Sequence, residues 1–432
     1  MMKPMMPFSK VRSVIIILSI ILLSGGLGYR LGEGNSAKNI SGGINNTQIV
    51  NTTTPTNALV DFSLFWDVWQ RIHRFYIESS TIDNQKLVYG AISGMVNALD
   101  DPYTSFFPPK ENQEFKDDMG GAFEGIGAQL EAKDGRILVV SPLKGSPAEK
   151  AGILSGDWIT KVDGVETFNW TTNQAVSKIR GKKGTSVTLS IFHANAKEAV
   201  DITIVRDTIT IPSVETWVKT ASEIKEINGT TASTKYAKST KKVAYISLSR
   251  FGDRLEEDWQ KAVSSVTQAL NTNGSISGLI LDLRGNPGGY LDGSVYIGGE
   301  FLKQGSTVVS QENSDGTRED YKVDRLGKLL SVPLVVLINK GSASAAEIVA
   351  GALRDNGRAT LIGETSFGKG SVQTPQELSG GASVHITTGK WLTPKGDWIT
   401  KKGIVPDIEV KWTFDEASQD AQLAKAVEFL LK

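Results

Sequence analysis

Two groups of residues in the C-terminal half of the chain carry side chains suited to nucleophilic catalysis. The first contains Ser344, in the segment Asn-Lys-Gly-Ser-Ala-Ser-Ala-Ala-Glu-Ile at 339–348. An apolar, β-branched run at 332–338 predicts a buried strand before it, and residues 347–354 predict a helix after it. The N–H groups at a helix start lack intrahelical acceptors and carry partial positive charge. A serine at this position therefore lies next to donors that can stabilise an oxyanion.

An ordinary helix start explains the same segment without catalysis. Ser344 and Glu347 have the spacing of a capping box, in which a serine and a glutamate satisfy the first N–H groups of a helix. Small residues also suit a tight turn between a strand and a helix. The interpretation of Ser344 as a nucleophile therefore depends on whether the chain also supplies a base.

The second group supplies a candidate base. Lys369 lies between two glycines, just after a second apolar segment at 359–362. Burial of a lysine lowers its pKa from a reference value of about 10.4 toward neutrality. A neutral lysine can take the proton of a serine hydroxyl, as in the serine–lysine variant of the catalytic triad. Gln373 follows four residues after Lys369, and its amide can orient the lysine if the chain turns back.

These motifs resemble those of the carboxyl-terminal processing proteases, the tail-specific serine peptidases with a Ser-Lys-Gln site. The family pattern has an asparagine before Gly-Ser-Ala-Ser-Ala, then Gly-x-x-Thr-x-Gly-Lys-Gly and a glutamine four residues later. Only the threonine is missing here, where residues 364–367 read Glu-Thr-Ser-Phe. The resemblance covers roughly residues 62–410, and it includes Leu-Asp-Asp-Pro-Tyr at 99–103, Asp-Leu-Arg-Gly-Asn-Pro-Gly-Gly at 282–289, Leu-Thr-Pro-Lys-Gly at 392–396 and Gly-Ile-Val-Pro-Asp at 403–407.

The resemblance implies a serine endopeptidase that cuts near the C-termini of proteins. Ser344 attacks the scissile carbonyl, and neutral Lys369 acts as the general base and later protonates the leaving amine. Gln373 orients Lys369. The oxyanion donors implied are the N–H groups of Gly289 and Ala345, although Gly289 is also the kind of residue that an ordinary tight turn needs. No metal and no cofactor is implied.

Composition limits the alternatives. A chain of 432 residues is too long for one core, so two or three domains are expected. Lys+Arg and Asp+Glu number 47 each, and this balance argues against a nucleic-acid-binding protein, which would be basic. The absence of cysteine excludes structural disulfides, cysteine nucleophiles and a lipoprotein anchor. The three histidines, His73, His193 and His385, are too far apart in the sequence to suggest a zinc site.

The N-terminal residues predict attachment to a membrane. Residues 1–29 combine a basic start with an apolar stretch, and the part from 13 to 29 reaches the short end of a membrane span. The basic residues place the N-terminus in the cytoplasm and the catalytic part outside it. We expect a single-pass anchor in a bacterial cell envelope; a cleaved signal peptide, giving a secreted or periplasmic protein, is the alternative. Residues 30–58 are rich in Asn, Thr, Ser and Gly and predict a flexible linker.

Residues 59–118 form the expected N-terminal helical region. Aromatic and apolar residues recur at helical spacing from Phe62 to Tyr76, so this helix has one strongly apolar face. His73 lies on that side and is interpreted as a packed helix residue. A second helix is expected at 85–99, ended by Asp-Asp-Pro. The resemblance implies that such helices pack on the protease core and can mediate contacts in a homodimer.

Residues 119–207 are expected to form a PDZ domain, a β-sandwich-like module inserted before the core. Its loop Gly125-Ile126-Gly127 resembles the carboxylate-binding loop of such domains. In PDZ recognition an extended peptide adds a strand to the sheet, and backbone N–H groups hold its terminal carboxylate. The expected partners are therefore protein or peptide substrates with accessible apolar C-termini.

Arg180 follows the longer PDZ helix, beside a glycine turn, and is a candidate regulatory residue. We hypothesise that it senses the bound tail and pairs with a group on the core, because a ligand shifts an equilibrium only through different affinity for two states. The alternative is an exposed cation in the basic run at 178–183, since surface charges usually contribute little.

Residues 208–432 are expected to form the protease core, which makes the whole an α+β multidomain protein. Strands and helices alternate to about residue 370, which indicates a wound α/β core, and the resemblance implies a spiral like that of crotonase and Clp protease. Residues 213–242 are an addition to the family pattern and are expected to form an exposed loop or hairpin. Two other functions remain open: a catalytically silent PDZ adaptor on the same fold, and a crotonase-like acyl-transfer enzyme.

Overall fold

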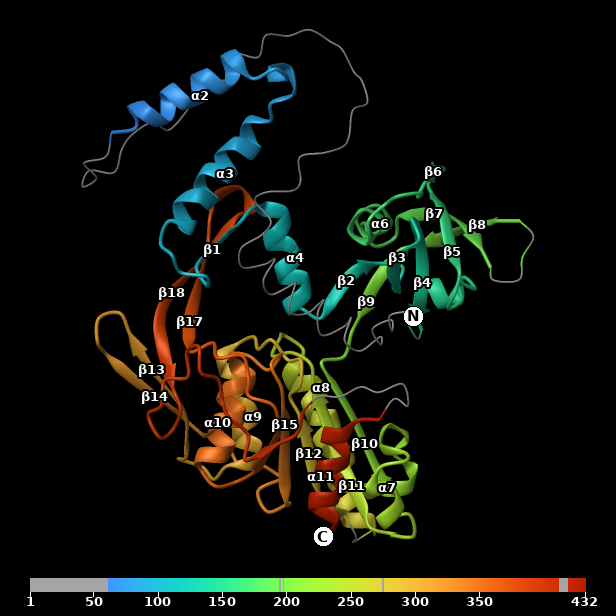
Figure 1. The fold of residues 1–432 in the computed structure, drawn as a ribbon, viewed down its shortest axis with the longest axis vertical. Coiled ribbons are helices and arrows are strands. Elements are labelled where there is room, and N and C mark those ends of the chain that lie inside the picture. The colour runs from blue at the N-terminus through green and yellow to red at the C-terminus, as the bar shows by residue number, and fades with distance from the viewer. Residues whose placement is uncertain (1–60, 144, 194–195, 197, 274–275, 412–418) are drawn as a thin grey trace, which may run out of the picture.

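The computed structural model describes residues 61–432 except 144, 194–195, 197, 274–275 and 412–418. The predicted membrane segment and linker, residues 1–58, lie outside this part of the chain. Within the described part, no helix is both long and apolar enough to cross a membrane. Figure 1 shows three bodies: N-terminal helices that project away from the rest, a β-rich module, and a larger core that contains the C-terminus.

The N-terminal region is helical, as the sequence predicts. Its elements are α2 (Ser63–Phe75), the 3-10 turn η1 (Ser79–Thr81), α3 (Asn84–Asn97), β1 (Ser105–Phe107) and α4 (Pro109–Met119). The start of α3 is fixed by Asp83, whose carboxylate accepts hydrogen bonds from the N–H groups of Gln85 and Lys86. No side chain of α2 is fully buried, so the described part of the chain covers its aromatic face only in part.

The β-rich module is built around one antiparallel sheet. Its members are β3 (Ala128–Lys133), β4 (Arg136–Pro142), β5 (Trp158–Val162), β6 (Val165–Glu166), β7 (Ser186–Phe192) and β8 (Val200–Val205), with helices α5 (Pro147–Lys150) and α6 (Thr172–Ile179). The strand order is β3-β4-β5-β7-β8, so β3 is an edge strand. Alternate residues of β4, Ile137 and Val139, are fully buried, as expected for a sheet with one face on a core.

A short two-stranded ribbon joins this module to the rest of the chain. Strand β2 (Ala122–Gly125) enters the module, β9 (Asp207–Thr210) leaves it, and the two pair in antiparallel register. The module is therefore connected to its neighbours through one ribbon, which Figure 1 shows between α4 and the core.

The core is organised around a six-stranded sheet of order β10-β11-β12-β15-β16-β19. These strands are β10 (Val214–Thr220), β11 (Lys242–Leu248), β12 (Ile276–Asp282), β15 (Leu334–Ile338), β16 (Thr360–Gly363) and β19 (Ile408–Glu409). All pairs from β11 to β19 are parallel, and only β10 is antiparallel to its neighbour. All five residues of β15 are buried, which explains why it reads as an uninterrupted apolar run.

Helices cover both faces of this sheet. Helices α8 (Leu255–Asn273), α9 (Leu291–Phe301) and α10 (Ala345–Asp355) share one apolar cluster with every second residue of β11 and β12. The opposite face packs against α11 (Ala421–Leu431) in a separate cluster that includes Ile280 and Val335. The expected wound α/β core is therefore present. The C-terminal ends of its parallel strands lie at the same edge of the sheet.

Residues 213–242 do not form the exposed loop or hairpin that the sequence suggests. Their first part is β10, which pairs with β11 along its whole length. The rest forms η2 (Ala221–Glu223), η3 (Lys225–Ile227) and α7 (Thr231–Lys235), whose apolar side chains pack against α11. Ile224 and Ile227 are completely buried, so this addition completes the core under the C-terminal helix.

A second sheet links the core to the N-terminal region. It contains β13 (Thr307–Asn313), β14 (Arg318–Lys322), β17 (Ser371–Glu377) and β18 (Ser383–Leu392), and β18 also pairs with β1 in antiparallel register. A segment near residue 105 is thereby held beside residues 383–385. The multidomain α+β arrangement is confirmed, whereas the likeness of the core to the crotonase and Clp spiral stays a prediction.

Candidate active site

Ser344 lies between strand β15 and helix α10, as the sequence predicts. Its backbone has φ 53° and ψ −118°, whereas an ordinary N-cap residue is extended. A non-glycine residue with such angles stores strain of about 1–3 kcal/mol, which the surrounding contacts must hold in place. The N–H of Ser344 donates to Oε2 of Glu347 at 2.9 Å. Glu347 is thus a capping residue, as the sequence suggests. Ser344, however, has an uncommon backbone conformation that helix capping does not require.

The strained serine is matched by a glycine loop that comes very close to it. A Cβ atom placed on Gly288 would lie 2.7 Å from Cβ of Ser344, so no other residue fits there without movement. Gly289 has φ +140°, and a Cβ on it would lie 2.1 Å from the carbonyl oxygen of Phe251. Gly288 therefore allows the loop after β12 to lie directly against the loop that carries Ser344, and Gly289 allows the same loop to lie against Phe251.

The N–H groups of the two predicted oxyanion donors have no acceptor in the described part of the chain. Ala345 is the first residue of α10, so its N–H has no intrahelical acceptor. Among the described residues, neither its N–H nor that of Gly289 donates to another group. Gly289 is also exposed, which leaves its N–H accessible to a substrate.

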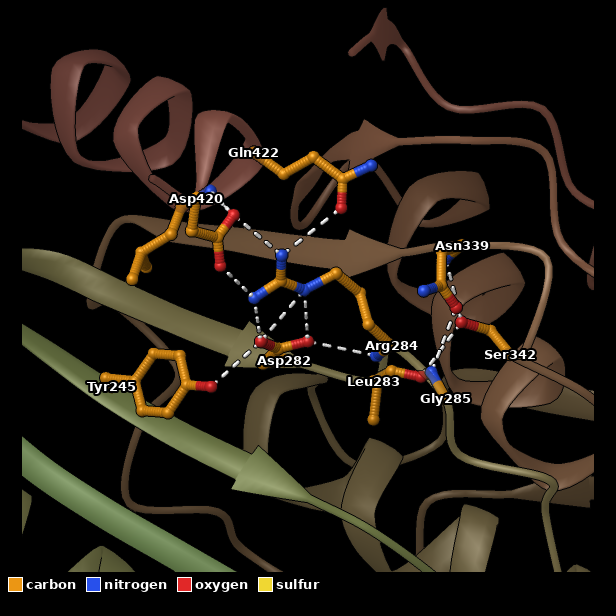
Figure 2. A network of polar contacts seen from close by, with 10 residues as sticks. Tyr245, Asp282, Leu283, Arg284, Gly285, Asn339, Ser342, Asp420 and Gln422 are labelled. Atoms are coloured by element: carbon orange, nitrogen blue, oxygen red, sulfur yellow. Dashed lines mark hydrogen bonds and ion pairs between the residues drawn. The ribbon is translucent and has the colours of Figure 1, made fainter. Parts of the chain in front are cut away.

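The glycine loop, residues 283–290 between β12 and α9, is joined to the loop that carries Ser344 by two asparagines and a serine. Oδ1 of Asn339 accepts hydrogen bonds from the N–H groups of Gly285 and Gly341, both at 2.9 Å. Figure 2 shows Ser342 beside this pair, and its hydroxyl donates to the carbonyl of Leu283 at 2.8 Å. Asn286 is completely buried and bridges the carbonyl of Leu248 and the N–H of Gly288. The positions of both loops are therefore fixed before any substrate binds.

A buried ion-pair network anchors the start of the glycine loop (Figure 2). The guanidinium of Arg284 contacts Asp282 at 2.5 Å and Asp420 at 2.8 Å, and its side chain is only 8% exposed. Gln422 accepts a further bond from it, and the hydroxyl of Tyr245 donates to Asp282 at 2.8 Å. Burial alone lowers the pKa of Arg284, but the two carboxylates outweigh burial and raise it well above its usual value.

Glu347 joins the loop of Ser344 to the loop of Lys369, a role that sequence reasoning missed. It is completely buried, and besides Ser344 it accepts hydrogen bonds from the N–H groups of Gly368 at 2.7 Å and Lys369 at 2.9 Å. The hydroxyl of Ser366 donates to it at 2.5 Å and accepts from the N–H of Ile404 at 2.6 Å. Burial raises the pKa of Glu347, although these hydrogen bonds oppose the shift. Ser366 stands where the family pattern has threonine, so the bridging hydroxyl is kept.

Lys369 is partly buried and forms no ion pair among the described residues. In the described part of the chain its Nζ makes no hydrogen bond, and its nearest aromatic neighbour is Tyr103, whose ring centroid lies 5.2 Å away. Burial lowers the pKa of Lys369, and the charges of Glu347 and Asp101 oppose this shift only in part. The carbonyl of Lys369 accepts a hydrogen bond from the indole of Trp391 at 2.9 Å, which holds the turn in place. These surroundings favour the neutral amine that a base requires.

Comparison with known proteins identifies the family. Residues 242–410 match the model of peptidase family S41, residues 138–191 match a PDZ domain, and residues 22–110 match the activating protease CtpB N-terminal domain. The chain is 40% identical over 366 residues to the carboxy-terminal processing protease CtpA of Bacillus subtilis, which covers 85% of this chain and 72% of that protein. The chain belongs to the carboxy-terminal processing proteases.

Two further similarities agree with this assignment. The carboxy-terminal-processing protease of Bartonella bacilliformis is 37% identical over 372 residues, or 85% of this chain and 79% of that protein. A putative S41 protease from Bacteroides fragilis has a similar fold at 17% identity, with a TM-score of 0.51 over 78% of this chain and 90% of that one. The expected serine-type peptidase is therefore confirmed.

The remaining predicted catalytic residue of this protease, Gln373, is engaged elsewhere. Its amide nitrogen donates to Oγ of Ser371 at 2.9 Å and to Oγ1 of Thr387 at 3.2 Å, and no hydrogen bond joins it to Lys369 among the described residues. His385, the histidine that an alternative triad would use, packs between the rings of Phe107 and Phe115. Burial lowers the pKa of His385, which keeps it neutral there.

The predicted peptide-binding loop of the protease lies between β2 and β3. The carbonyls of Ile126 and Gly127 accept hydrogen bonds from the N–H groups of Ala148 and Leu143, both at 2.8 Å, which fixes the loop against α5. Arg180, at the C-terminal end of α6, is exposed and places its guanidinium 4.6 Å from the ring centroid of Phe123 in β2. Arg180 therefore lies beside the loop that it is predicted to sense.

Proposed function

We propose that this protease is an endopeptidase that works outside the cytoplasm and cuts near the C-termini of its substrates, with Ser344 as nucleophile and Lys369 as general base. The observation that carries the proposal is Glu347, whose single carboxylate accepts hydrogen bonds from the backbone N–H groups of both residues. Because the two segments share one buried acceptor, nucleophile and base are held in the same small region of the core.

In the proposed reaction, the neutral amine of Lys369 takes the proton of the Ser344 hydroxyl as Oγ attacks the scissile carbonyl. The carbonyl oxygen becomes an oxyanion, which the N–H groups of Gly289 and Ala345 stabilise. Collapse of this intermediate breaks the peptide C–N bond, and the ammonium of Lys369 gives its proton to the leaving amine. Water then hydrolyses the acyl-enzyme by the same proton route. The lowered pKa of Lys369 supports this role, since it increases the neutral fraction near neutral pH.

Gln373 is proposed to orient Lys369 in the active arrangement. At present its amide nitrogen is bonded to Ser371 and Thr387. A change of side-chain rotamer has to release these bonds before the amide reaches Lys369. The present arrangement of Gln373 is accordingly proposed to be a resting one.

The PDZ module is proposed to bind the apolar C-terminal tail of the substrate. Strand β3 is the edge of its sheet and packs beside α6, which leaves one row of backbone groups available for an added strand. The tail carboxylate would then lie at Gly125-Ile126-Gly127, next to Arg180. Arg180 is proposed to report this binding to the core.

The location and assembly of the protease follow from its N-terminal region. The basic and apolar pattern of residues 1–29 supports a membrane anchor, with a cleaved signal peptide as the alternative. The exposed apolar face of α2 supports a homodimer through the N-terminal helices, because Phe62 is 49% and Tyr76 is 50% exposed in a single chain. Both statements remain proposals.

The proposed function is tested by incubating the protein with an unfolded protein that ends in an apolar tail and mapping the products by mass spectrometry. We expect internal cuts close to the C-terminus, lost in Ser344→Ala. A matched substrate with a charged C-terminal tail controls for tail recognition. Tail binding without any cleavage would instead support the silent adaptor.

A further inference from the structure

The segment before β1 reaches the base although it belongs to the N-terminal region. Asp101, Tyr103 and Thr104 lie far outside residues 242–410, which match the peptidase model. Oδ1 of Asp101 accepts the N–H of Tyr103 at 3.1 Å, and its Oδ2 accepts the hydroxyl of Thr104 at 2.6 Å. The carboxylate therefore closes a tight turn, and this turn points the Tyr103 ring at Lys369.

The same turn is attached to the strand that crosses the site. Oγ1 of Thr104 accepts the N–H of Thr387 in β18 at 3.0 Å, and Thr104 is buried. Directly after it, β1 pairs with β18, with Ser105 opposite His385. The position of Tyr103 is thus set by hydrogen bonds on both sides rather than by a mobile surface loop.

We propose that Tyr103 is a positioning residue for the general base: its ring lies over Nζ of Lys369, excludes water from it and restricts the lysine side chain. The inference rests on the proposed function of Lys369 and adds that the active site is incomplete without the N-terminal turn. Its geometric basis is the 5.2 Å distance from Nζ to the ring centroid and the absence, among the described residues, of any hydrogen bond to Nζ.

The ring has two opposing effects on Lys369. Its π face attracts an ammonium, which favours the charged form by about 0.5–2 kcal/mol, or at most about 1.5 pKa units. Exclusion of water disfavours the charged form, and burial shifts lysine pKa values by up to about 3–5 units. Because burial is the largest influence on the pKa of Lys369, we expect water exclusion to decide the sign. The other ionisable groups around Lys369 are Glu347 from α10, Asp101 from the turn and His385 from β18, and they are unchanged when only the ring is replaced.

The experiment compares Tyr103→Ala, Tyr103→Leu and Tyr103→Phe in the full chain. Tyr103→Ala is expected to lower kcat/KM at neutral pH about tenfold to a hundredfold and to move the acid limb of the pH profile upward by about one unit. Tyr103→Leu is expected to recover part of this loss, and Tyr103→Phe most of it, because bulk and not the hydroxyl excludes water. An acid limb that stays in place, or moves downward, in Tyr103→Ala overturns the proposal.

A matched control separates this effect from loss of docking. Phe106 lies in β1, is buried against Tyr89, and points its ring to that cluster, not to Lys369. Phe106→Leu is expected to lower thermal stability but to leave the acid limb unchanged. If Phe106→Leu and Tyr103→Ala change the pH profile equally, Tyr103 only supports the strand.

A second readout does not depend on turnover. In a Ser344→Ala background, the rate at which Lys369 is acetylated by acetic anhydride, followed by mass spectrometry across pH, reports the pKa of its amine. Adding Tyr103→Ala is expected to raise that pKa. If the wild-type chain cleaves nothing but this shift is seen, the proposed function fails, the positioning of a base fails with it, and only the exclusion of water from Lys369 by the ring stands; an unchanged labelling profile rejects the positioning role alone.

Discussion

The two sides of the active site are built in different ways. On the nucleophile side, the loops that carry Ser344 and Gly289 are held by buried groups of the core, and Arg284 reaches from there to the C-terminal helix through Asp420 (Figure 2). On the base side, named for the proposed role of Lys369, Glu347 holds the backbone of Lys369, and the ring of Tyr103, from a turn of the N-terminal region, lies near Nζ.

This difference suggests where activity can be controlled. Breaking the nucleophile side means leaving buried charges and amides without partners, which is costly. The base side is easier to change. A movement of the Tyr103 ring, a new rotamer of Gln373 or a displacement of β1 from β18 would be enough. We therefore propose that the nucleophile side is preorganised and that the base side is the adjustable part of the site.

The largest effect is expected when either side loses its reacting group. Ser344→Ala and Lys369→Ala should each lower kcat/KM by about a thousandfold or more, and the double variant should lose no more than either single one, since the two act as a unit. Cleavage of a tailed substrate at pH 8 measures this, with circular dichroism to verify the fold. Near-normal activity of Lys369→Ala would reject the dyad and bring His385 back as a candidate. Chelators should have no effect in any of these assays.

The second prediction concerns the ion pair between Arg284 and Asp420, which supports the nucleophile side from outside the site. Asp420→Asn keeps the cap of α11, because the Asn oxygen can still accept the N–H of Leu423. It removes one of the two carboxylates that pair with Arg284. Loss of a partner in a buried ion pair should lower the free energy of unfolding by about 3 kcal/mol. It should also lower kcat about tenfold with little change in KM, since the oxyanion loop loosens.

Urea unfolding and steady-state kinetics measure both effects of Asp420→Asn. Asp315→Asn, in an exposed turn, is the matched control and should change neither quantity. A variant as active and stable as the wild type would mean that the ion pair does not support the glycine loop.

The sequence predicts those site residues that lie in recognisable local patterns. Ser344 and Lys369 each lie in a short turn after an apolar strand, and this pattern is visible in the sequence. Glu347 was seen only as a capping residue, because its bonds to Gly368 and Lys369 come from a segment folded back in space. Tyr103 is even more distant in sequence from its partner.

The missed parts of the fold have a similar cause. Residues 213–242 read as polar because their few apolar side chains, such as Ile224 and Ile227, have no regular period, yet these pack under α11. Arg284 and Asp420 belong to separate elements that only tertiary packing joins. Periodicity predicts individual helices and strands, but it carries no signal for pairs that meet only after the sheets have assembled.

The third prediction concerns the base side and the pH dependence of stability that Lys369 causes. Burial lowers the pKa of Lys369, so between this lowered value and the unfolded value of about 10.4 the folded state binds fewer protons than the unfolded state. The free energy of unfolding contributed by this residue therefore rises with pH through that window. Lys369→Met should be more stable than the wild type at pH 7, and the difference should shrink toward pH 10.

Urea unfolding at both pH values measures this difference. Lys303→Met, at an exposed position in the turn after α9, is the control and should show no such trend. A constant difference between Lys369→Met and the wild type across pH would mean that Lys369 titrates normally in the folded protein. Activity of the wild type should rise with pH over the same range, because the neutral amine is the reactive form.

The smallest effect is expected at the PDZ module, which touches neither side of the site directly. Arg180 stacks on Phe123 and is exposed, so removing it should cost little stability. If Arg180 reports tail binding to the adjustable base side, Arg180→Ala should lower the turnover of long tailed substrates a few-fold. Binding of the same tail to the PDZ module should be unchanged, as should cleavage of a short peptide that lacks the tail.

The control for Arg180 is Arg136, a second PDZ arginine that lies over the ring of Trp158, away from the tail-binding loop. Arg136→Ala should leave all three measurements unchanged. Fluorescence anisotropy with a labelled tail peptide gives the binding, and mass spectrometry gives the turnover. If Arg180→Ala turns over long substrates like the wild type, Arg180 is only a surface charge, and control of the base side must come from another contact, such as the docking of the Tyr103 turn on β18.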